Sequence, residues 1–289
     1  MLQQCLVSLS SIELPQGVEV DIVVVDNDAT PSSHAVVEQY QTQSHFPVYY
    51  VHEPKRGIPI ARNRALIESL QLDSDYVVFI DDDEWVESAW LVNLYDYCQA
   101  RGGKVVVSGA VISELPESTP DHMRALFGKQ KRKTGEKLGA CATNNVIIPR
   151  YVYDEWGVRF DESNPLAGGT DTIYFVQAVA RGVEIYKCNE AIVHEHIPAS
   201  RTHLSWFAKR KYRAGVTDAW RKRQKGRAWV AILLSALGQA IIYSLLTLIY
   251  ILLTNKHKRN KAWLKACRAA GVLAGLVGVQ VQSYRKIAH

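Results

Sequence analysis

Along residues 1–200, short apolar runs alternate with stretches of helical periodicity. Residues 18–26 (VEVDIVVVD) and 75–80 (DYVVFI) are rich in β-branched side chains, and each run ends at an acidic residue, which predicts two buried strands. The same reading predicts further strands, in chain order, over residues 47–52, 104–110, 145–148 and, at the end of the series, 192–194.

Helical patterns separate these strands and predict an α/β fold. They cover residues 32–42, 60–71, 86–100 and 170–181, while the polar stretch 113–138, with KQKRKTGEK at 129–137, predicts a mobile loop. Strands separated by helices of this length favour a mostly parallel sheet with helices on both faces. In such sheets ligands bind beyond the carboxyl ends of the strands, so that is where candidate chemistry is expected.

The C-terminal third contains a long apolar run. Residues 228–255 carry no charge, and Gln239 is their only strongly polar member. A membrane span needs about 20 apolar residues, so the run predicts a transmembrane helix, the alternative being a buried helix of a soluble core. A second uncharged stretch, residues 269–284, is short for a span and predicts a re-entrant or interfacial segment.

Charge divides the chain into two modules. Residues 1–200 contain 16 Lys and Arg against 28 Asp and Glu, whereas residues 201–289 contain 18 Lys and Arg and a single acid, Asp218. The basic residues flank the apolar run on both sides, which favours an anionic membrane over nucleic acid as the partner. Because both flanks are basic, a single span and a hairpin bent near Gly238 both remain open.

Composition excludes several classes of protein. The 14 Tyr, 7 Trp and 6 Phe exclude a disordered chain. Five cysteines, an odd number without a C-x-x-C pair, argue against a disulfide framework and a thiolate zinc site. The first residues lack the pattern of a signal peptide, so a reducing, cytosolic location is expected for residues 1–200.

Four consecutive carboxylates, Asp81 to Glu84, directly follow the predicted strand 75–80. Such acids repel one another at a strand end unless a cation is present, and Mg²⁺ or Mn²⁺ binds carboxylates together with phosphate oxygens. In an extended chain Asp81 and Asp83 would point to the same side. The alternative is a solvated acidic turn that caps the helix predicted from residue 86.

Three weaker candidates follow other predicted elements. Asp171, in the segment GGTD at 168–171, fits either a general base at a tight glycine turn or a helix cap. Arg62 lies in the first turn of a predicted helix, where a cation suits an anionic ligand or simply faces solvent. His194 and His196 end the last strand and fit either a structural pair or, with Asp83, a metal site.

Six segments together resemble the family 2 glycosyltransferases, which have the GT-A fold. In the order typical of that family, the segments are VVVDNDAT (23–30), RGIPIARNRAL (56–66), VVFIDDDEWVE (77–87), TNNVIIPR (143–150), GGTDTIYF (168–175) and VHEHIPASR (193–201). The basic, apolar tail is similar to that of bacterial exopolysaccharide transferases of the succinoglycan glucosyltransferase type. The resemblance implies a catalytic domain over residues 1–200 and a membrane-associated helical region over residues 201–289.

The resemblance also implies a role for individual residues. The nucleotide-sugar donor would contact Asp26 at its base, Arg62 near the nucleotide and Asp81 near the ribose. Asp82 would also belong to the nucleotide-sugar site. A divalent metal, Mg or Mn, would bind Asp83 and His194, with His196 in reserve, and Asp171 would be the general base. The acceptor would lie against Thr143, Asn144, Asn145 and Gly169.

The implied function is inverting transfer of a sugar, most simply from a UDP-sugar, to a glycan or lipid-linked acceptor of cell-surface polysaccharide synthesis. The catalytic domain would be cytoplasmic, at a bacterial inner membrane. One alternative is a catalytically inactive membrane component of an assembly complex. Another, a magnesium-dependent phosphotransferase, should show a phosphate-binding Gly-Lys loop or a nucleophilic Asp, and neither is found.

One departure from the family pattern concerns the start of the chain. Family members usually have an apolar strand ending in a Pro-Thr/Ser-Tyr-Asn-Arg-like segment just before a helix like LQQCLVSL, with which this sequence opens. We expect the strand starting at Val18 to lack that neighbour, and nucleotide binding to be weaker as a result.

Overall fold

The computed structural model describes residues 1–127, 132–163, 168–224 and 226–279. These residues form two compact units, each described by itself below. The first comprises residues 1–113, 130–165 and 170–196, and the second comprises residues 114–129, 166–169 and 197–289.

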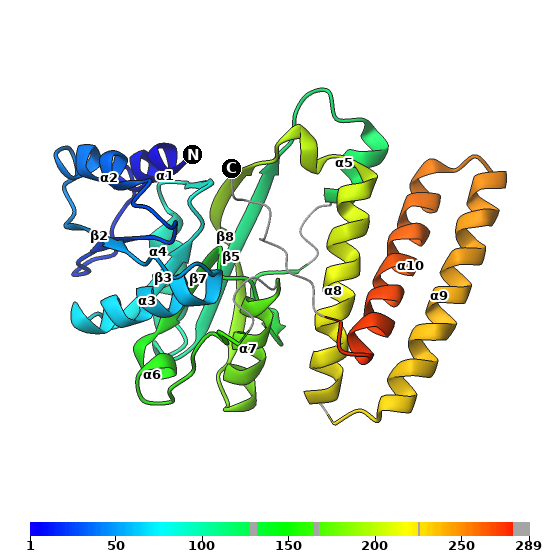
Figure 1. Cartoon of the computed structure of the whole chain (residues 1–289). Helices are drawn as coiled ribbons and strands as arrows, with labels where there is room; N and C mark the ends of the chain where they lie inside the picture. The colour runs from blue at the N-terminus through cyan, green and yellow to red at the C-terminus, as the bar shows by residue number, and fades with distance from the viewer. Residues whose placement is uncertain (128–131, 164–167, 225, 280–289) are drawn as a thin grey trace. The chain divides into compact units, whose positions relative to one another are not determined.

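The first unit is an α/β structure built on two sheets (Figure 1). β1 (Ile22–Asp26) and β2 (Val48–His52) pair in parallel as a two-stranded sheet, and within the described residues β1 has no second strand neighbour. The larger sheet has the order β3-β7-β5-β8-β4, with β6 beside β8. Its strands are β3 (Tyr76–Ile80), β4 (Glu84–Val86), β5 (Val106–Glu114), β6 (Lys137–Leu138), β7 (Asn145–Pro149) and β8 (Ile185–His196).

The α/β class is confirmed, but the expected parallel arrangement is wrong for the larger sheet. β7 runs antiparallel to both β3 and β5, and β8 runs antiparallel to β4 and β6. An alternation of strands and helices along the chain does not reveal which strands become neighbours. Here β7 enters between β3 and β5 from the opposite direction, so no parallel crossover links these neighbours.

Helices cover both faces of the larger sheet, as the apolar pattern predicts. Val107 and Ile147 point to one face, while the alternate residues Val106, Val146 and Ile148 point to the other. Each such side chain contributes about 1.5–3 kcal/mol when fully buried. The first face packs against α1 (Leu2–Leu9), α2 (His34–Gln41) and α4 (Trp90–Gln99), and the second against α3 (Ile58–Gln71), α6 (Arg150–Tyr153) and α7 (Thr170–Ala180).

Two element predictions need correction. The helix expected over 86–100 begins only at Trp90, because residues 84–86 pair with β8 as the short strand β4. The polar stretch 113–138 is not simply a loop, since it contains α5 (Asp121–Phe127) and β6. Residues 129–131 of its basic run lie outside the described residues.

The second unit contains the short η1 helix (Ala199–Arg201) and three long helices. These are α8 (Leu204–Gln224), α9 (Trp229–Leu252) and α10 (Lys256–Leu276), with α10 between the other two (Figure 1). Glycines allow α8 and α10 to touch through their backbones. A Cβ on Gly271 would lie 1.9 Å from the Tyr212 carbonyl oxygen, and one on Gly215 would lie 2.1 Å from the Arg268 oxygen.

An ion-pair network joins α8 to α10 beside these glycines. Asp218, the only acid of residues 201–289, is buried on α8 and accepts hydrogen bonds from Arg221 and from Arg268 of α10. A buried carboxylate needs such partners, because an unpaired charge in the interior is costly. Asp218 therefore fixes the pairing of the two helices at one level.

α9 is long and apolar enough to cross a membrane by length and composition. It is one continuous helix, so the chain does not bend near Gly238 as one of the two topologies required. The turn comes instead after Leu252, where Thr254 adopts a positive φ of 51°. Residues 269–276 belong to α10, whereas residues 280–284 of the second apolar stretch lie outside the described residues.

Candidate active site

The four acids after β3 form a tight turn at the carboxyl end of that strand. The Glu84 N–H donates to the Asp81 carbonyl oxygen at 3.2 Å, and the chain continues into β4. The segment is therefore not extended, and the side-by-side placement expected from strand alternation does not apply to Asp81 and Asp83. Asp82, at the tip of the turn, is exposed.

Glu84 turns away from the other acids and into the protein. It is 2% exposed, and its carboxyl group accepts hydrogen bonds from the Asp81 backbone N–H at 3.2 Å and from Asn144 Nδ2 at 2.6 Å. Desolvation, reinforced by the charge of Asp81, raises the pKa of Glu84 to about 9. Glu84 is thus largely protonated near neutral pH, and it ties the acidic turn to the segment before β7.

The pairing of β3 with β7 explains why Asn144 reaches this turn. Ile80 is opposite Asn145 in the antiparallel ladder, so the start of β7 lies beside the end of β3. The Asn145 side chain, however, is buried and donates to the Ala110 and Ala191 carbonyl oxygens while accepting from Trp90 Nε1. Its expected role as an acceptor contact is therefore wrong, because it links strands in the core.

Thr143 is also buried, at 1% exposure. Its Oγ1 has no hydrogen-bond partner in the part of the chain that the structure describes. Of the four residues expected to meet the acceptor, Asn144 and Gly169 are partly exposed. Asn144 already donates to Glu84, so this segment supports the acidic turn as well as facing it.

Arg62 brings three separate sequence segments together. Its Nη2 lies 3.9 Å from Asp81 Oδ1 at the end of β3, and its Nη1 donates to Thr170 Oγ1 at 3.4 Å at the start of α7. Its guanidinium also lies over the Phe160 ring, 5.7 Å from the centroid. α3 begins at Ile58, so Arg62 lies in its second turn rather than in the first turn expected from the sequence, and it has an anionic partner there.

The acids around Arg62 influence one another's protonation. The pKa of Asp81 is raised to about 6, chiefly by desolvation, while Arg62 acts in the opposite direction. The charges of Asp83, Asp82 and Asp171 raise the pKa of Asp81 further, which shows that Asp171 belongs to the same electrostatic neighbourhood. The pKa of Asp82 is raised too, by desolvation and then by Asp83.

Asp171 stands in the first turn of α7, where acidic side chains are favoured. Its Oδ1 accepts the N–H of Thr172 at 2.7 Å, which fixes the carboxylate at the helix start. Gly169, two residues earlier, belongs to the second unit and has a φ of 88°. A Cβ at that position would lie 2.8 Å from Thr217 Oγ1, so glycine is needed there.

Asp26 uses its carboxylate within the protein. It is 6% exposed and accepts hydrogen bonds from the Asp28 N–H, from the Ser33 N–H and hydroxyl, and from the Tyr50 hydroxyl. Desolvation opposes ionisation, but these bonds outweigh it and lower the pKa of Asp26. Asn27, which sequence reasoning missed, donates to the Glu53 and Lys55 carbonyl oxygens and accepts from the Gly57 N–H.

A known family matches the part of the chain that carries Asp26, Arg62 and the acidic turn. The sequence model described as "Glycosyl transferase family 2" matches residues 1–157. This chain belongs to glycosyl transferase family 2. It is also 32% identical over 292 residues to the succinoglycan biosynthesis protein ExoM of Rhizobium meliloti (strain 1021), covering 98% of this chain and 91% of that protein.

Solved structures support the fold expected of family 2. S. aureus TarS 1–349 in complex with UDP superposes with a TM-score of 0.51 at 15% identity, over 73% of this chain and 61% of that one. GalNAc-T7 with UDP, GalNAc and Mn²⁺ gives a TM-score of 0.51 at 12% identity, over 71% and 46%. The chain thus spans less than two thirds of the solved chains it matches, and at these identities the likeness concerns the fold alone.

The metal ligands expected for this family 2 chain come from the acidic turn and from the end of β8. Across the described residues, no three His, Cys, Asp or Glu side chains form a group that could hold a metal ion. His194 instead bonds Glu87 Oε1 through Nε2 at 3.0 Å, and both His194 and His196 pack against the Trp85 ring. Continued by one residue beyond the Glu84–Glu195 pair, the β4–β8 register sets His196 opposite Asp83, and a shared metal site of these residues stays a prediction.

The chemistry of the acidic turn nevertheless suits a hard divalent cation. Asp81, Asp82 and Asp83 offer carboxylate oxygens at one strand end, where desolvation, followed by the like charges of these acids, raises the pKa of Asp81 and Asp82. Mg²⁺ and Mn²⁺ prefer oxygen ligands and complete their shells with water and phosphate oxygens. The carboxylates of the turn fit such a cation.

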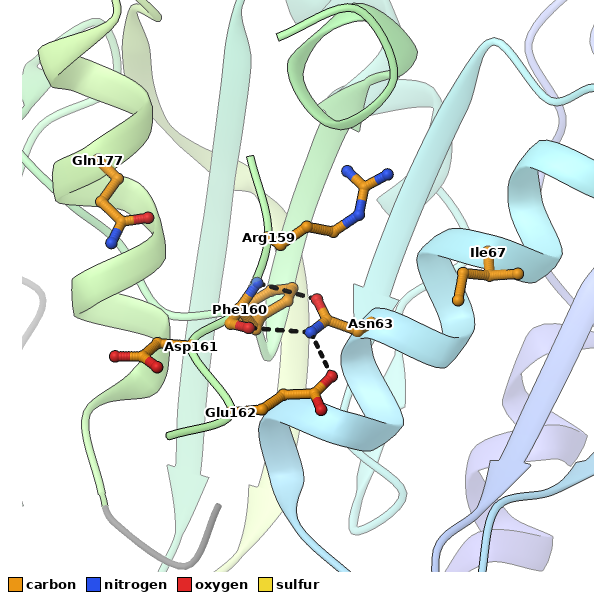
Figure 2. A pocket seen from close by; sticks show the side chains of 7 residues that line it. All are labelled: Asn63, Ile67, Arg159, Phe160, Asp161, Glu162 and Gln177. Carbon is orange, nitrogen blue, oxygen red and sulfur yellow. Dashed lines mark hydrogen bonds between the residues drawn. The ribbon is translucent and has the colours of Figure 1, made fainter. Parts of the chain in front are cut away.

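A cavity of about 560 Å³ opens between α3, residues 159–162 and Gln177 of α7 (Figure 2). Asn63 spans it, donating to the Phe160 carbonyl oxygen and Glu162 Oε1 while accepting from the Phe160 N–H. Asn63 thereby holds residues 160–162 against α3. Of the two consecutive residues Arg62 and Asn63, Arg62 contacts the acidic turn, whereas Asn63 holds residues 160–162 in place.

Proposed function

We propose that this chain transfers a sugar from a nucleotide-sugar donor to a hydroxyl of a glycan or lipid-linked acceptor, with inversion, in cell-surface polysaccharide synthesis. The observation that carries the proposal is the convergence of Asp81, Thr170 and the neighbouring Asp171 around Arg62. The family 2 match and the similarity to a succinoglycan biosynthesis protein support it. Complexes of the similar TarS with UDP and UDP-GlcNAc support a UDP-sugar as donor.

In this proposal the donor lies along the acidic turn. Arg62 meets the negative charge of the nucleotide, and Asp81 and Asp82 accept hydrogen bonds from its ribose. Asp26 acts through the loop after β1, because its own carboxylate is engaged by Ser33, Asp28 and Tyr50. A bound Mg²⁺ or Mn²⁺, held by Asp83 with Asp81, would supply positive charge that stabilises the departing diphosphate.

Asp171 is the general base of the proposed reaction. Its Oδ2 takes the proton of the acceptor hydroxyl as that oxygen forms a bond to the anomeric carbon and the bond to the diphosphate oxygen breaks. The single displacement inverts the anomeric centre without a covalent glycosyl-enzyme. The Thr172 N–H bond to Oδ1 orients the carboxylate, and Asn144 is the acceptor contact that the burial of Thr143 and Asn145 leaves available.

We assign residues 1–200 to catalysis on the cytoplasmic side of a bacterial inner membrane and residues 201–289 to membrane attachment. The apolar helix α9 and the excess of Lys and Arg after residue 200 support the attachment. The five cysteines, all free, fit a reducing compartment for the catalytic part. A membrane-bound catalytic unit also places the active site near lipid-linked acceptors.

The test is donor turnover by the purified full-length chain. UDP release from a panel of UDP-sugars is measured with Mn²⁺, with Mg²⁺ and with EDTA, with and without a lipid extract as acceptor. We expect metal-dependent UDP release from one donor, increased by the extract. An inactive assembly component would bind membranes yet release no UDP from any donor, and that result would overturn the proposal.

A further inference from the structure

The surface of α9 is apolar on nearly every side that faces away from α10. Leu234, Ile241 and Leu248 are 63%, 60% and 59% exposed and lie seven residues apart, so they form one line along the helix. Exposed apolar area of this extent marks an interaction surface in a folded protein. The question is how this surface meets the membrane.

α9 does not stand alone, because α10 contacts it along its whole length. Trp229 Nε1 donates to the Leu276 carbonyl oxygen at 3.4 Å at one end of α9. Lys265 Nζ donates to the Tyr243 hydroxyl at 3.4 Å near the middle, and Lys258 lies over the Tyr250 ring toward the other end. The two helices therefore pack antiparallel. If α9 crosses a membrane, each residue of α10 lies at the same membrane depth as the α9 residue beside it.

The side of α10 that meets these tyrosines carries a basic stripe. We define the stripe as Lys258, Lys261 and Lys265, which are exposed and spaced by three and four residues, so that they share one helix face. Beyond α10 lies α8 (Figure 1). α9 contains no charged residue, α10 contains six and α8 contains eight. Polarity therefore increases from α9 through α10 to α8.

This gradient decides between two orientations. If α9 crossed the bilayer, Lys265 would lie near its middle, because Tyr243 is about 21 Å from one end of α9 and about 14 Å from the other. A charge at the centre of the bilayer lowers the equilibrium constant for the crossing orientation roughly 100-fold. If the helices instead lie parallel to the surface, α9 enters the acyl boundary and α10, about 8–10 Å above it, reaches the headgroups.

We propose that α9 lies in the plane of one membrane leaflet, at the boundary between headgroups and acyl chains, with the basic stripe of α10 on anionic headgroups. The chain would then attach to one leaflet without crossing the bilayer. This inference rests on the membrane attachment in the proposed function and specifies its geometry. It places the α8–α9 turn and the α9–α10 turn on the same side of the membrane.

The test measures immersion depth in the full-length protein, reconstituted in vesicles of phosphatidylethanolamine and phosphatidylglycerol. Spin labels are attached to Leu234→Cys, Ile241→Cys and Leu248→Cys, and depth is read from collisions with oxygen and with a nickel chelate. Labelling of the parent protein gives the background from its native cysteines. We expect all three labels within about 3 Å of one depth. A crossing helix would bury Ile241 about 10 Å deeper than the other two, since seven residues span about 10.5 Å.

A fourth label at Lys261→Cys gives an independent reading from the basic stripe. In-plane helices place it about 8–10 Å shallower than Leu248, whereas a crossing helix places both at similar depth. Labels on α9 that meet only the nickel chelate would show that α9 stays in water. Labels immobilised and shielded from both reagents would show that a second copy covers it. Either result would overturn the proposal.

The same preparations are assayed for UDP release, which separates this inference from the proposed function. A crossing depth profile with turnover intact contradicts the in-plane geometry and leaves the transferase proposal standing. An in-plane depth profile without turnover in the parent protein supports the in-plane geometry and contradicts the transferase proposal.

Discussion

Arg62 Nη2 lies 3.9 Å from Asp81 Oδ1, and the same guanidinium donates through Nη1 to Thr170 Oγ1. The arginine therefore connects the end of β3 with the start of α7, two places separated by almost ninety residues in the sequence. Arg62 thus contacts Asp81, the proposed donor-site acid, and Thr170, the residue before the proposed general base Asp171.

Replacing Arg62 should impair donor binding while leaving the fold intact. We expect Arg62→Gln to lower the affinity for UDP at least tenfold, because the nucleotide loses a charged hydrogen-bond donor (about 1.4 kcal/mol or more). Its ion pair with Asp81 is long and partly solvated, so the melting temperature should fall by less than about 4 °C. Arg64→Gln, which removes the pair with Glu68 on the same helix, is the matched control and should leave affinity unchanged.

Asp83 should be needed for the effect of metal on donor binding. Calorimetric titration of UDP with and without Mn²⁺ should show a metal-dependent gain in affinity for the parent protein and none for Asp83→Ala, since the carboxylate that neutralises the cation is gone. Asp161→Ala, at an exposed acid beside the cavity, should keep the full gain. A retained gain in Asp83→Ala would move the metal site elsewhere.

Glu84 should be a structural group whose charge state links stability to pH. Its folded-state pKa of about 9 lies above the ordinary value of 4.5. Between these values the folded protein holds a proton that the unfolded chain has released, so the contribution to the free energy of unfolding is full below pH 4.5 and declines toward pH 9. Urea unfolding in EDTA at pH 5, 7 and 8.5 should show this decline, and Glu84→Gln should reduce it.

Truncation at the same position separates packing and hydrogen bonding from charge. Glu84→Ala leaves the Asp81 N–H and the Asn144 amide without their acceptor and opens a cavity, which should cost about 2–4 kcal/mol at pH 7. Glu84→Gln should cost less, because it keeps the volume and one acceptor. Equal losses for the two variants would mean that hydrogen bonding by Glu84 does not hold the turn.

Substituting the glycines between α8 and α10 with any larger residue should destabilise the packing of these two helices. In Gly271→Ala the added methyl meets the Tyr212 carbonyl oxygen, so the helices must separate and we expect a loss of about 1–3 kcal/mol. Gly238→Ala on α9 is the control, because its Cβ meets no atom within 4 Å. Thermal melting of the second unit in detergent should fall for Gly271→Ala and not for Gly238→Ala.

The sequence predicted most elements of the first unit because local pattern decides them. Apolar runs such as Tyr76–Ile80 are β-branched and aromatic enough to be strands in any arrangement, and the acids that follow them mark the strand end. The strand order could not be predicted in the same way. β7 lies between β3 and β5 through pairings over long separations, which local periodicity does not encode.

The candidate site was predicted at the level of segments and less well at the level of side chains. Asn145 and Asn144 are adjacent, yet one side chain enters the core and the other faces the acidic turn, an assignment set by the register of β7 against β3. Glu84 resembled its acidic neighbours in sequence, but the turn directs it inward. Pairing of β4 with β8 sets His194 opposite Trp85, a contact that the local sequence pattern does not encode.

The central claim is that Asp171 is the base of a sugar transfer, and the split between donor binding and turnover in Asp171→Asn tests it most directly. The amide keeps the size of the side chain but cannot accept the proton, so we predict unchanged UDP affinity and turnover lower by about 10²–10⁴-fold. Turnover within a few-fold of the parent, at equal affinity, would contradict the account and assign the proton to another group.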